Sequence, residues 1–256
     1  MYNLILSILA GVLSFVALSF ALGGGEFKPL YGILPGVVVL VGVYLYLARR
    51  SMQQVEAIMT EAQNVLAGAQ GDGSKPMTSM RQAEQHMNKA IAILKEGYKH
   101  EKWQFLVKAQ LDGQIGQLLY MSKKYDSAEG YLKNAMKQHW SAHAMLGTLY
   151  YKRKDYDAME EAFEVAVKST PKEALLWNVY AYCLWKSNQK DKAIDVLTRS
   201  LEHLSDDERT RDNLAALQKN RKMKMRGWNM MWYQFHLDTP PQPNPRDLVK
   251  VRHSRR

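Results

Sequence analysis

The chain has 256 residues, a length typical of one or two domains, and 46% of them are hydrophobic, which is enough for a sizeable core. Its 35 Lys and Arg residues outnumber its 25 Asp and Glu residues, and the formal net charge of +10 favours anionic partners such as nucleic acid or a cytoplasmic membrane surface. The single cysteine, Cys183, excludes an intramolecular disulfide framework and fits a reducing compartment.

Two long uncharged runs open the chain. Residues 4–22 and residues 30–48 each contain 19 residues without a charge, and a short loop separates them. At a rise of about 1.5 Å per residue, each run would extend roughly 28 Å as a helix, close to the thickness of the hydrocarbon core of a bilayer. The pattern predicts a transmembrane hairpin.

The flanking charges predict the orientation of this hairpin. Arg49 and Arg50 directly follow the second run, so the positive-inside rule places both termini in the cytoplasm. We therefore expect a multi-pass protein of a bacterial inner membrane whose downstream domain faces the cytoplasm. A cleaved signal peptide is the alternative for the first run and would invert this topology. The run is longer than a usual signal core and lacks a positive charge before it, although Ala21-x-Gly23 would be an acceptable cleavage site.

Apolar residues recur at alternating intervals of three and four after the second run, at Met52, Val55, Met59, Ala62, Leu66 and Ala69. This spacing predicts a helix that continues from the membrane span, and it is typical of a coiled-coil seam that could pair two chains into a homodimer. The seam is short and contains alanines, so a stalk helix that packs on the first downstream repeat is the favoured interpretation. Residues 68–76 predict a flexible linker, because they are rich in Gly and end in Pro.

The middle of the chain repeats one pattern of small and bulky residues with a period of 34 residues. Small residues at Gly147 and Ala181 allow two helices to cross closely, and Pro171 ends a helix. A fixed period of this length indicates that one helix-turn-helix unit is used repeatedly. The aligned pairs are Leu146 with Tyr180, Gly147 with Ala181, Tyr150 with Leu184, Phe163 with Leu197, and Ala166 with Ser200.

These residues resemble the tetratricopeptide repeat family, whose consensus combines Leu-Gly and Tyr in the first helix with Ala and Phe in the second and a final Pro. His143 and Met159 depart from the consensus Trp and Ala, and the following copy restores both as Trp177 and Ala193. The resemblance implies an all-α solenoid of three to four repeats over residues 77–226, including a capping helix. Its clearest copies are residues 109–139, 140–173 and 174–207, and a degenerate copy lies upstream around Ala83, Met87 and Ala90.

Two local predictions follow from this alignment. The first clear copy is 31 residues from the next, so we expect a shortened loop around Gln138 to Trp140. Asp206 to Glu208 suit the start of the capping helix, because carboxylates favour a helix N-terminus. Its later turns would carry a basic patch of Lys219, Arg221, Lys222, Lys224 and Arg226.

An aromatic stretch follows the basic patch and includes Trp228, Trp232, Tyr233 and Phe235. It either folds back on the solenoid or lies at a membrane interface, and folding back is the favoured interpretation because solenoid ends need covering and Gly227 permits a sharp turn. The remaining residues of a 227–256 tail are rich in Pro and basic residues and are expected to be extended.

The sequence contains no complete motif of a catalytic site. Gly23 to Gly25 lack the Gly-Lys-Ser/Thr of a phosphate-binding loop, and His139 with His143 lack a third metal ligand. We expect neither an enzyme nor a metal or cofactor.

The resemblance implies recognition of a protein or peptide in a concave groove. It carries over onto ten residues of this chain: Gln110, Gln117, Tyr120, Thr148, Tyr151, Lys152, Asn178, Tyr182, Trp185 and Lys186. The first repeat lacks the cation of a carboxylate clamp, so binding of acidic chaperone tails is not expected.

The predicted function is a membrane-anchored scaffold or adaptor that assembles a protein complex. One alternative is an electrostatic adaptor that binds anionic lipid or, with less support, nucleic acid through the basic patch. Another is a structural subunit of a membrane machine that packs through Gly32, Gly36 and Gly42.

Overall fold

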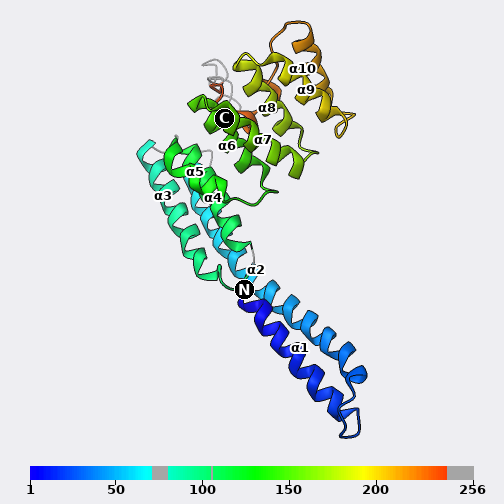
Figure 1. Cartoon of the computed structure of the whole chain (residues 1–256). Helices are drawn as coiled ribbons and strands as arrows, with labels where there is room; N and C mark the ends of the chain where they lie inside the picture. The colour runs from blue at the N-terminus through cyan, green and yellow to red at the C-terminus, as the bar shows by residue number, and fades with distance from the viewer. Residues whose placement is uncertain (71–79, 105, 241–256) are drawn as a thin grey trace, which may run out of the picture. The chain divides into compact units, whose positions relative to one another are not determined.

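The computed structural model describes residues 1–70, 80–104 and 106–240, and every regular element within them is helical (Figure 1). The predicted all-α fold is confirmed. The chain divides into two compact units, Met1–Met136 and Lys137–Arg256. The first unit contains α1 (Tyr2–Ala21), α2 (Pro29–Gln70), α3 (Met80–Glu96), η1 (Gly97–His100), α4 (Val107–Met121) and α5 (Tyr125–Lys133). The second contains α6 (Trp140–Arg153), α7 (Tyr156–Ser169), α8 (Ala174–Lys186), α9 (Lys190–Leu201), α10 (Glu208–Gln218), η2 (Arg226–Trp228) and α11 (Met230–Tyr233).

The hairpin of α1 and the first half of α2 (Figure 1) buries small and polar side chains and leaves large apolar ones exposed. All the buried residues of α1 are polar or small, namely Asn3, Ser7, Gly11 and Ser19. Large apolar side chains point outward instead, and Leu13 and Leu34 are 71% and 73% exposed. Both helices are long and apolar enough to cross a membrane, by length and composition. A soluble domain would bury these leucines, whereas lipid would cover them.

Close approach of α1 and α2 depends on glycine. A Cβ added to Gly36 would lie 2.9 Å from the Cβ of Phe15, and one added to Gly32 would lie 2.3 Å from the Phe15 carbonyl oxygen. These two glycines therefore pack within the chain. Gly42 is different, because a Cβ there would meet nothing within 4 Å.

The second half of α2 packs on α3, as the stalk interpretation expects. Val55 and Ala62, two positions of the predicted coiled-coil seam, are 0% and 2% exposed within this unit. Nδ1 of His86 in α3 lies 3.0 Å from the carbonyl oxygen of Val65. The helix continues through Gly68 to Gln70, so it includes the first three residues of the predicted linker, most of which lies outside the described residues.

The helical pair α4 and α5 differs from the later pairs in the length of its second helix. α5 has 9 residues, whereas α7 has 14 and α9 has 12. The prediction of a shortened loop near residues 138–140 is wrong, because residues 134–139 separate α5 from α6 and only residues 170–173 separate α7 from α8. The 31-residue spacing of this copy is therefore explained by its short second helix, α5, and not by a short loop.

In the second unit, the pairs α6 with α7 and α8 with α9 show the packing that the repeat pattern predicts. A Cβ on Gly147 would lie 2.5 Å from Cε2 of Phe163, so the missing side chain makes room for this ring. Phe163 is fully buried and stacks on Tyr180 at 4.8 Å between ring centroids. The small residue Ala181 is likewise fully buried. Lys154 ends α6 with a left-handed φ of 63°, and Asp155 caps α7 by accepting from the amide of Ala158.

The capping helix α10 begins at the predicted position, because the Asp207 side chain accepts a hydrogen bond from the amide of Thr210 at 2.8 Å. The prediction that its later turns carry the basic patch is wrong. α10 ends at Gln218, and Asn220 has a left-handed φ of 53°. Residues 221–225 are non-helical because Met223 and Met225 turn inward, where they are 7% and 4% exposed.

The aromatic stretch then folds back on the same unit. The backbone has a positive φ of 51° at Asn229, whereas Gly227, the expected turn position, has no positive φ. Trp232 and Phe235 are both fully buried. Most of the Pro-rich and basic tail, residues 241–256, lies outside the described residues.

Candidate functional site

In the first unit, predicted groove residues contact other parts of the same unit. The Gln110 amide donates to the sulfur of Met59 in α2 at 3.3 Å. Tyr120 is fully buried, and its ring centroid lies 5.0 Å from that of Tyr125. Gln117 is half-buried. The stalk part of α2 thus contacts one predicted groove residue, Gln110, and Tyr120 packs within its own helical pair.

Two predicted groove residues of the second unit are structural. Thr148 is fully buried and donates to the carbonyl oxygen of Met145 at 2.8 Å. Asn178 is also fully buried, and its amide donates to Thr210 while its oxygen accepts from Asn213, both at 2.8 Å. These amides hold α10 against α8 and are not accessible to a ligand.

The other predicted residues of this unit form an aromatic surface on α6 and α8, comprising Tyr151, Lys152, Tyr182, Trp185 and Lys186. The Tyr182 and Trp185 rings meet edge to face at 5.7 Å, and the Lys186 ammonium lies 4.7 Å from the Trp185 ring centroid. Burial, together with the nearby Asp238 carboxylate, raises the pKa of Tyr182 to about 12. Burial also raises the pKa of Tyr151. Both phenols are therefore protonated hydrogen-bond donors at neutral pH.

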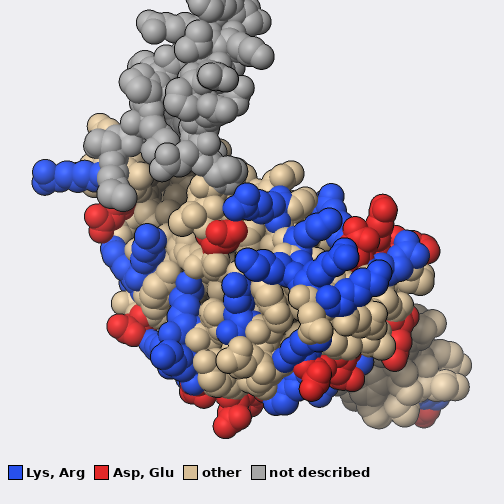
Figure 2. All heavy atoms as spheres, turned by 90° about the horizontal axis from the view of Figure 1, so that it is seen from above, with Lys and Arg blue, Asp and Glu red and all other residues tan. Residues whose placement is uncertain are grey.

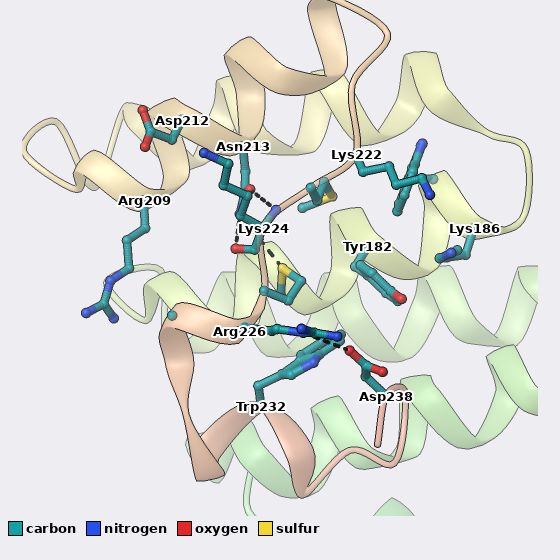
Figure 3. Close-up of a pocket in the computed structure, with 14 residues that line it drawn as sticks. Tyr182, Lys186, Arg209, Asp212, Asn213, Lys222, Lys224, Arg226, Trp232 and Asp238 are labelled. Carbon is teal, nitrogen blue, oxygen red and sulfur yellow. Dashed lines mark hydrogen bonds and ion pairs between the residues drawn. The ribbon is translucent and has the colours of Figure 1, made fainter. Parts of the chain in front are cut away.

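Residues 229–238, which we term the C-terminal segment, lie on this aromatic surface (Figure 3). The Trp232 ring meets the Tyr182 ring edge to face, with 4.8 Å between centroids. Phe235 lies 6.4 Å from Trp140 at the start of α6. The Lys152 ammonium donates to the carbonyl oxygen of His236 at 2.6 Å. Two rings and one backbone carbonyl thus join the segment to the first helices of two successive helical pairs.

A cavity of about 630 Å³ lies between the C-terminal segment, α8 and α10. Trp185, Tyr182 and Trp232 give it an aromatic lining. Its cations come from three parts of the unit and are Lys186, Arg209, Lys222, Lys224 and Arg226.

Acidic side chains only partly balance these cations. Asp212 and Asp238 are the carboxylates of the lining, and Arg226 lies 4.0 Å from Asp238. Among the described residues, the ammonium groups of Lys222 and Lys224 have no ion-pair partner. Figure 2 shows Lys and Arg side chains spread over the face seen from above, with Asp and Glu among them. The basic patch divides accordingly, since three of its members line the cavity and Lys219 and Arg221 do not.

The described part of the chain contains no group of three or more His, Cys, Asp or Glu side chains placed to hold a metal ion. His143 is buried, and burial together with this neighbour lowers the pKa of His139. Cys183 is fully buried, and burial raises the pKa of its thiol.

Comparison with known proteins agrees with the repeat geometry. A family model of the tetratricopeptide repeat matches residues 114–174 and again residues 144–208. Residues 114–208 therefore contain tetratricopeptide repeats. The chain is 35% identical over 75 residues to the peroxisomal targeting signal receptor of Saccharomyces cerevisiae, and 33% identical over 75 residues to that of Candida glabrata. The match covers 29% of this chain but only 12% and 13% of the two relatives.

Sequence reasoning favoured folding of the aromatic stretch back on the repeats, but it did not predict that the stretch would lie on the aromatic surface. From their aromatic character alone, Trp232 and Phe235 could be buried either against the protein or at a membrane interface. Their spacing of three residues, which places two rings on one side of a helical turn, is the signal that was available. Trp140, which contacts Phe235, does not belong to the carried-over groove positions at all.

Proposed function

We propose that this protein is a membrane-anchored scaffold whose tetratricopeptide repeats bind a peptide segment of another protein. One observation carries the proposal: the aromatic surface, together with Trp140 of α6, already holds a stretch of chain by two ring contacts and a lysine-to-carbonyl hydrogen bond. Tyr and Trp give large contact area with little loss of side-chain freedom, and a donor to a backbone carbonyl accepts any sequence at that position. The surface therefore has the chemistry of a peptide site.

The hairpin of α1 and α2 supports the membrane part of the proposal. Its outward leucines and inward polar residues suit lipid, and the exposed Arg49 and Arg50 favour a cytoplasmic location for the repeats. Holding one binding partner at the bilayer raises its effective concentration near other membrane proteins. Tethering, and not catalysis, is the mechanism that we infer.

The relatives support recognition of a segment in another protein. Their name describes a receptor for a targeting signal, and their similarity to this chain lies within 75 residues. We infer from this similarity only that the repeats of this chain also recognise a segment of a partner.

The test is retrieval of partners from native membranes with a full-length variant in which Tyr151, Tyr182 and Trp185 are all replaced by alanine. Tyr156→Ala, which changes a half-buried tyrosine of α7 outside the aromatic surface, is the matched control. We expect the triple variant to lose the partner protein that the wild-type chain and the control retain. Normal retrieval by a folded triple variant would refute the proposal.

The cation-lined cavity favours a second function, adhesion to an anionic ligand such as a lipid headgroup. Lys222 and Lys224 enter the cavity lining from a non-helical stretch and have no ion-pair partner among the described residues. Replacing both by glutamine should weaken an electrostatic association and reduce its salt dependence, because each paired cation contributes to that dependence. The same change should leave binding by the aromatic surface unaltered.

A further inference from the structure

We propose that the C-terminal segment is an intramolecular ligand of the aromatic surface, and that the surface binds partner peptides with two aromatic side chains three residues apart. The inference rests on the proposed function and names the partner's chemistry. It also implies that a partner must displace the chain's own segment.

The anchors of the segment are its aromatic side chains. Trp232 and Phe235 are 0% exposed, and Tyr233 between them is 8% exposed. Met230 and Met231, by contrast, are 73% and 52% exposed, so apolar character alone does not bury a residue here. Trp232 and Phe235 are three residues apart, and the Phe235 amide donates to the Trp232 carbonyl oxygen at 3.2 Å, so one turn of chain joins the two fully buried rings. A ligand of this surface needs this pair of rings, whereas the exposed Met230 and Met231 can be replaced.

The backbone contact adds affinity without sequence preference. Lys152 reaches the carbonyl oxygen of His236 from the last turn of α6. Every peptide offers a carbonyl oxygen at the equivalent place, so this bond is available to a partner as well. The two rings thus determine which peptides bind, and the lysine fixes the position of the peptide backbone.

Several features make the segment exchangeable. Its only regular element is α11, which has 4 residues, and positive φ values of 51° at Asn229 and His236 bracket the contacts. The indole N–H of Trp232 is buried and has no acceptor among the described residues. A buried donor without an acceptor disfavours the bound state, so a partner that supplies one would compete well. The segment therefore binds well enough to occupy the surface, but a partner with better hydrogen bonding can displace it.

Covalent linkage has a measurable consequence for affinity. A segment joined by a short stretch of chain has an effective concentration on the order of 1 mM. If the segment binds the open surface with an intrinsic Kd of about 10 μM, it leaves about 1% of the chains with the surface unoccupied. A peptide added to the intact chain should then bind about 100-fold more weakly than it binds the open surface.

The experiment uses the full-length chain in detergent micelles with a protease recognition sequence inserted after the exposed Gly227. The probe is a fluorescent peptide of residues 228–240, and its binding is measured by anisotropy before cleavage and after cleavage and washing. We expect binding to rise about 100-fold after cleavage. A peptide with Trp232→Ala and Phe235→Ala should not bind, and a matched peptide with Met230→Ala and Met231→Ala should bind as tightly as the natural sequence.

Three results would overturn the inference. If the cleaved fragment remained bound and did not exchange with the peptide, the segment would be a permanent cap. The peptide would fail to bind the cleaved chain if the surface had no affinity of its own, a result interpreted only after hydrogen exchange shows that α6 to α9 remain folded. Equal binding before and after cleavage would show that the segment does not occupy the surface.

An uncleaved chain with Trp232→Ala and Phe235→Ala gives an independent check, since it should bind the natural peptide as the cleaved chain does. Because the probe is the chain's own sequence, failure here is distinct from failure to retrieve a cellular partner.

Discussion

Replacing Gly147 by alanine tests the crossing of α6 and α7 on which the repeat fold depends. The added Cβ would lie 2.5, 2.7 and 2.8 Å from three atoms of the Phe163 ring. This ring is fully buried and stacked on Tyr180, so it cannot move aside without disturbing a second contact. Overpacking of this kind costs about 1–3 kcal/mol, whereas removal of a helix glycine contributes about 1 kcal/mol in the opposite direction. We expect a net destabilisation of about 1 kcal/mol.

Gly130 is the matched control. It lies exposed inside α5, and a Cβ there would meet nothing within 4 Å. Gly130→Ala should therefore stabilise its helix by about 0.5–1 kcal/mol, because only the backbone propensity changes. The two substitutions are chemically identical and should have opposite signs.

Hydrogen exchange read by mass spectrometry suits this comparison, because it reports each helix separately in a chain that also contains apolar N-terminal helices. A loss of about 1 kcal/mol should accelerate exchange in α6 and α7 about fivefold in Gly147→Ala. In a double variant with Phe163→Leu, the smaller side chain should recover part of the loss, with a coupling of about 1 kcal/mol. Equal stabilisation by both alanine substitutions would refute the reasoning about the crossing.

Three further predictions concern the second unit. Burial raises the pKa of Glu164, but the Arg199 guanidinium at 2.9 and 3.0 Å outweighs it and the net pKa is lowered. The ion pair therefore stabilises above the unfolded pKa of about 4.3 and is lost as pH falls through the folded value, so thermal unfolding should show Glu164→Gln destabilised by about 0.5–1 kcal/mol at pH 7 and unchanged near pH 2. Asn178→Ala should lower the free energy of unfolding by about 1–3 kcal/mol in urea titrations, because the buried Asn213 amide loses its acceptor; a neutral effect would contradict this network. Cys183 should react with iodoacetamide only after unfolding, since burial raises its pKa; rapid alkylation of the folded chain, seen by mass spectrometry, would be the contrary result.

The sequence predicted the helical pairs well because their packing code is local. A small residue at Gly147 and a ring at Phe163 occur at fixed positions in one repeat, and their contact follows from the helix crossing alone. The end of α10 was not predictable in this way. Lys and Arg have good helix propensity, so residues 219–226 favoured a continuing helix, but burial of Met223 and Met225 prevailed.

The candidate site was predicted in part for the same reason. Tyr182 and Trp185 could be placed on one surface from the repeat register alone. Burial of Trp232 and Phe235 depends on contacts between residues far apart in the sequence, Tyr182 with Trp232 and Trp140 with Phe235, for which no periodic pattern exists. An aromatic stretch beside cations is equally suited to a protein surface or a membrane interface, so composition could not decide between them.

Photocrosslinking from position 185 in native membranes tests the central claim most directly. Trp185 belongs to the aromatic surface, lines the cavity and is half-buried, so a photoreactive phenylalanine analogue there would reach a bound peptide. The account predicts an adduct with another protein in the membrane fraction, more abundant when Trp232 and Phe235 are replaced by alanine. Recovery of the chain outside the membrane fraction, or adducts only with its own C-terminal segment in both forms, would contradict it.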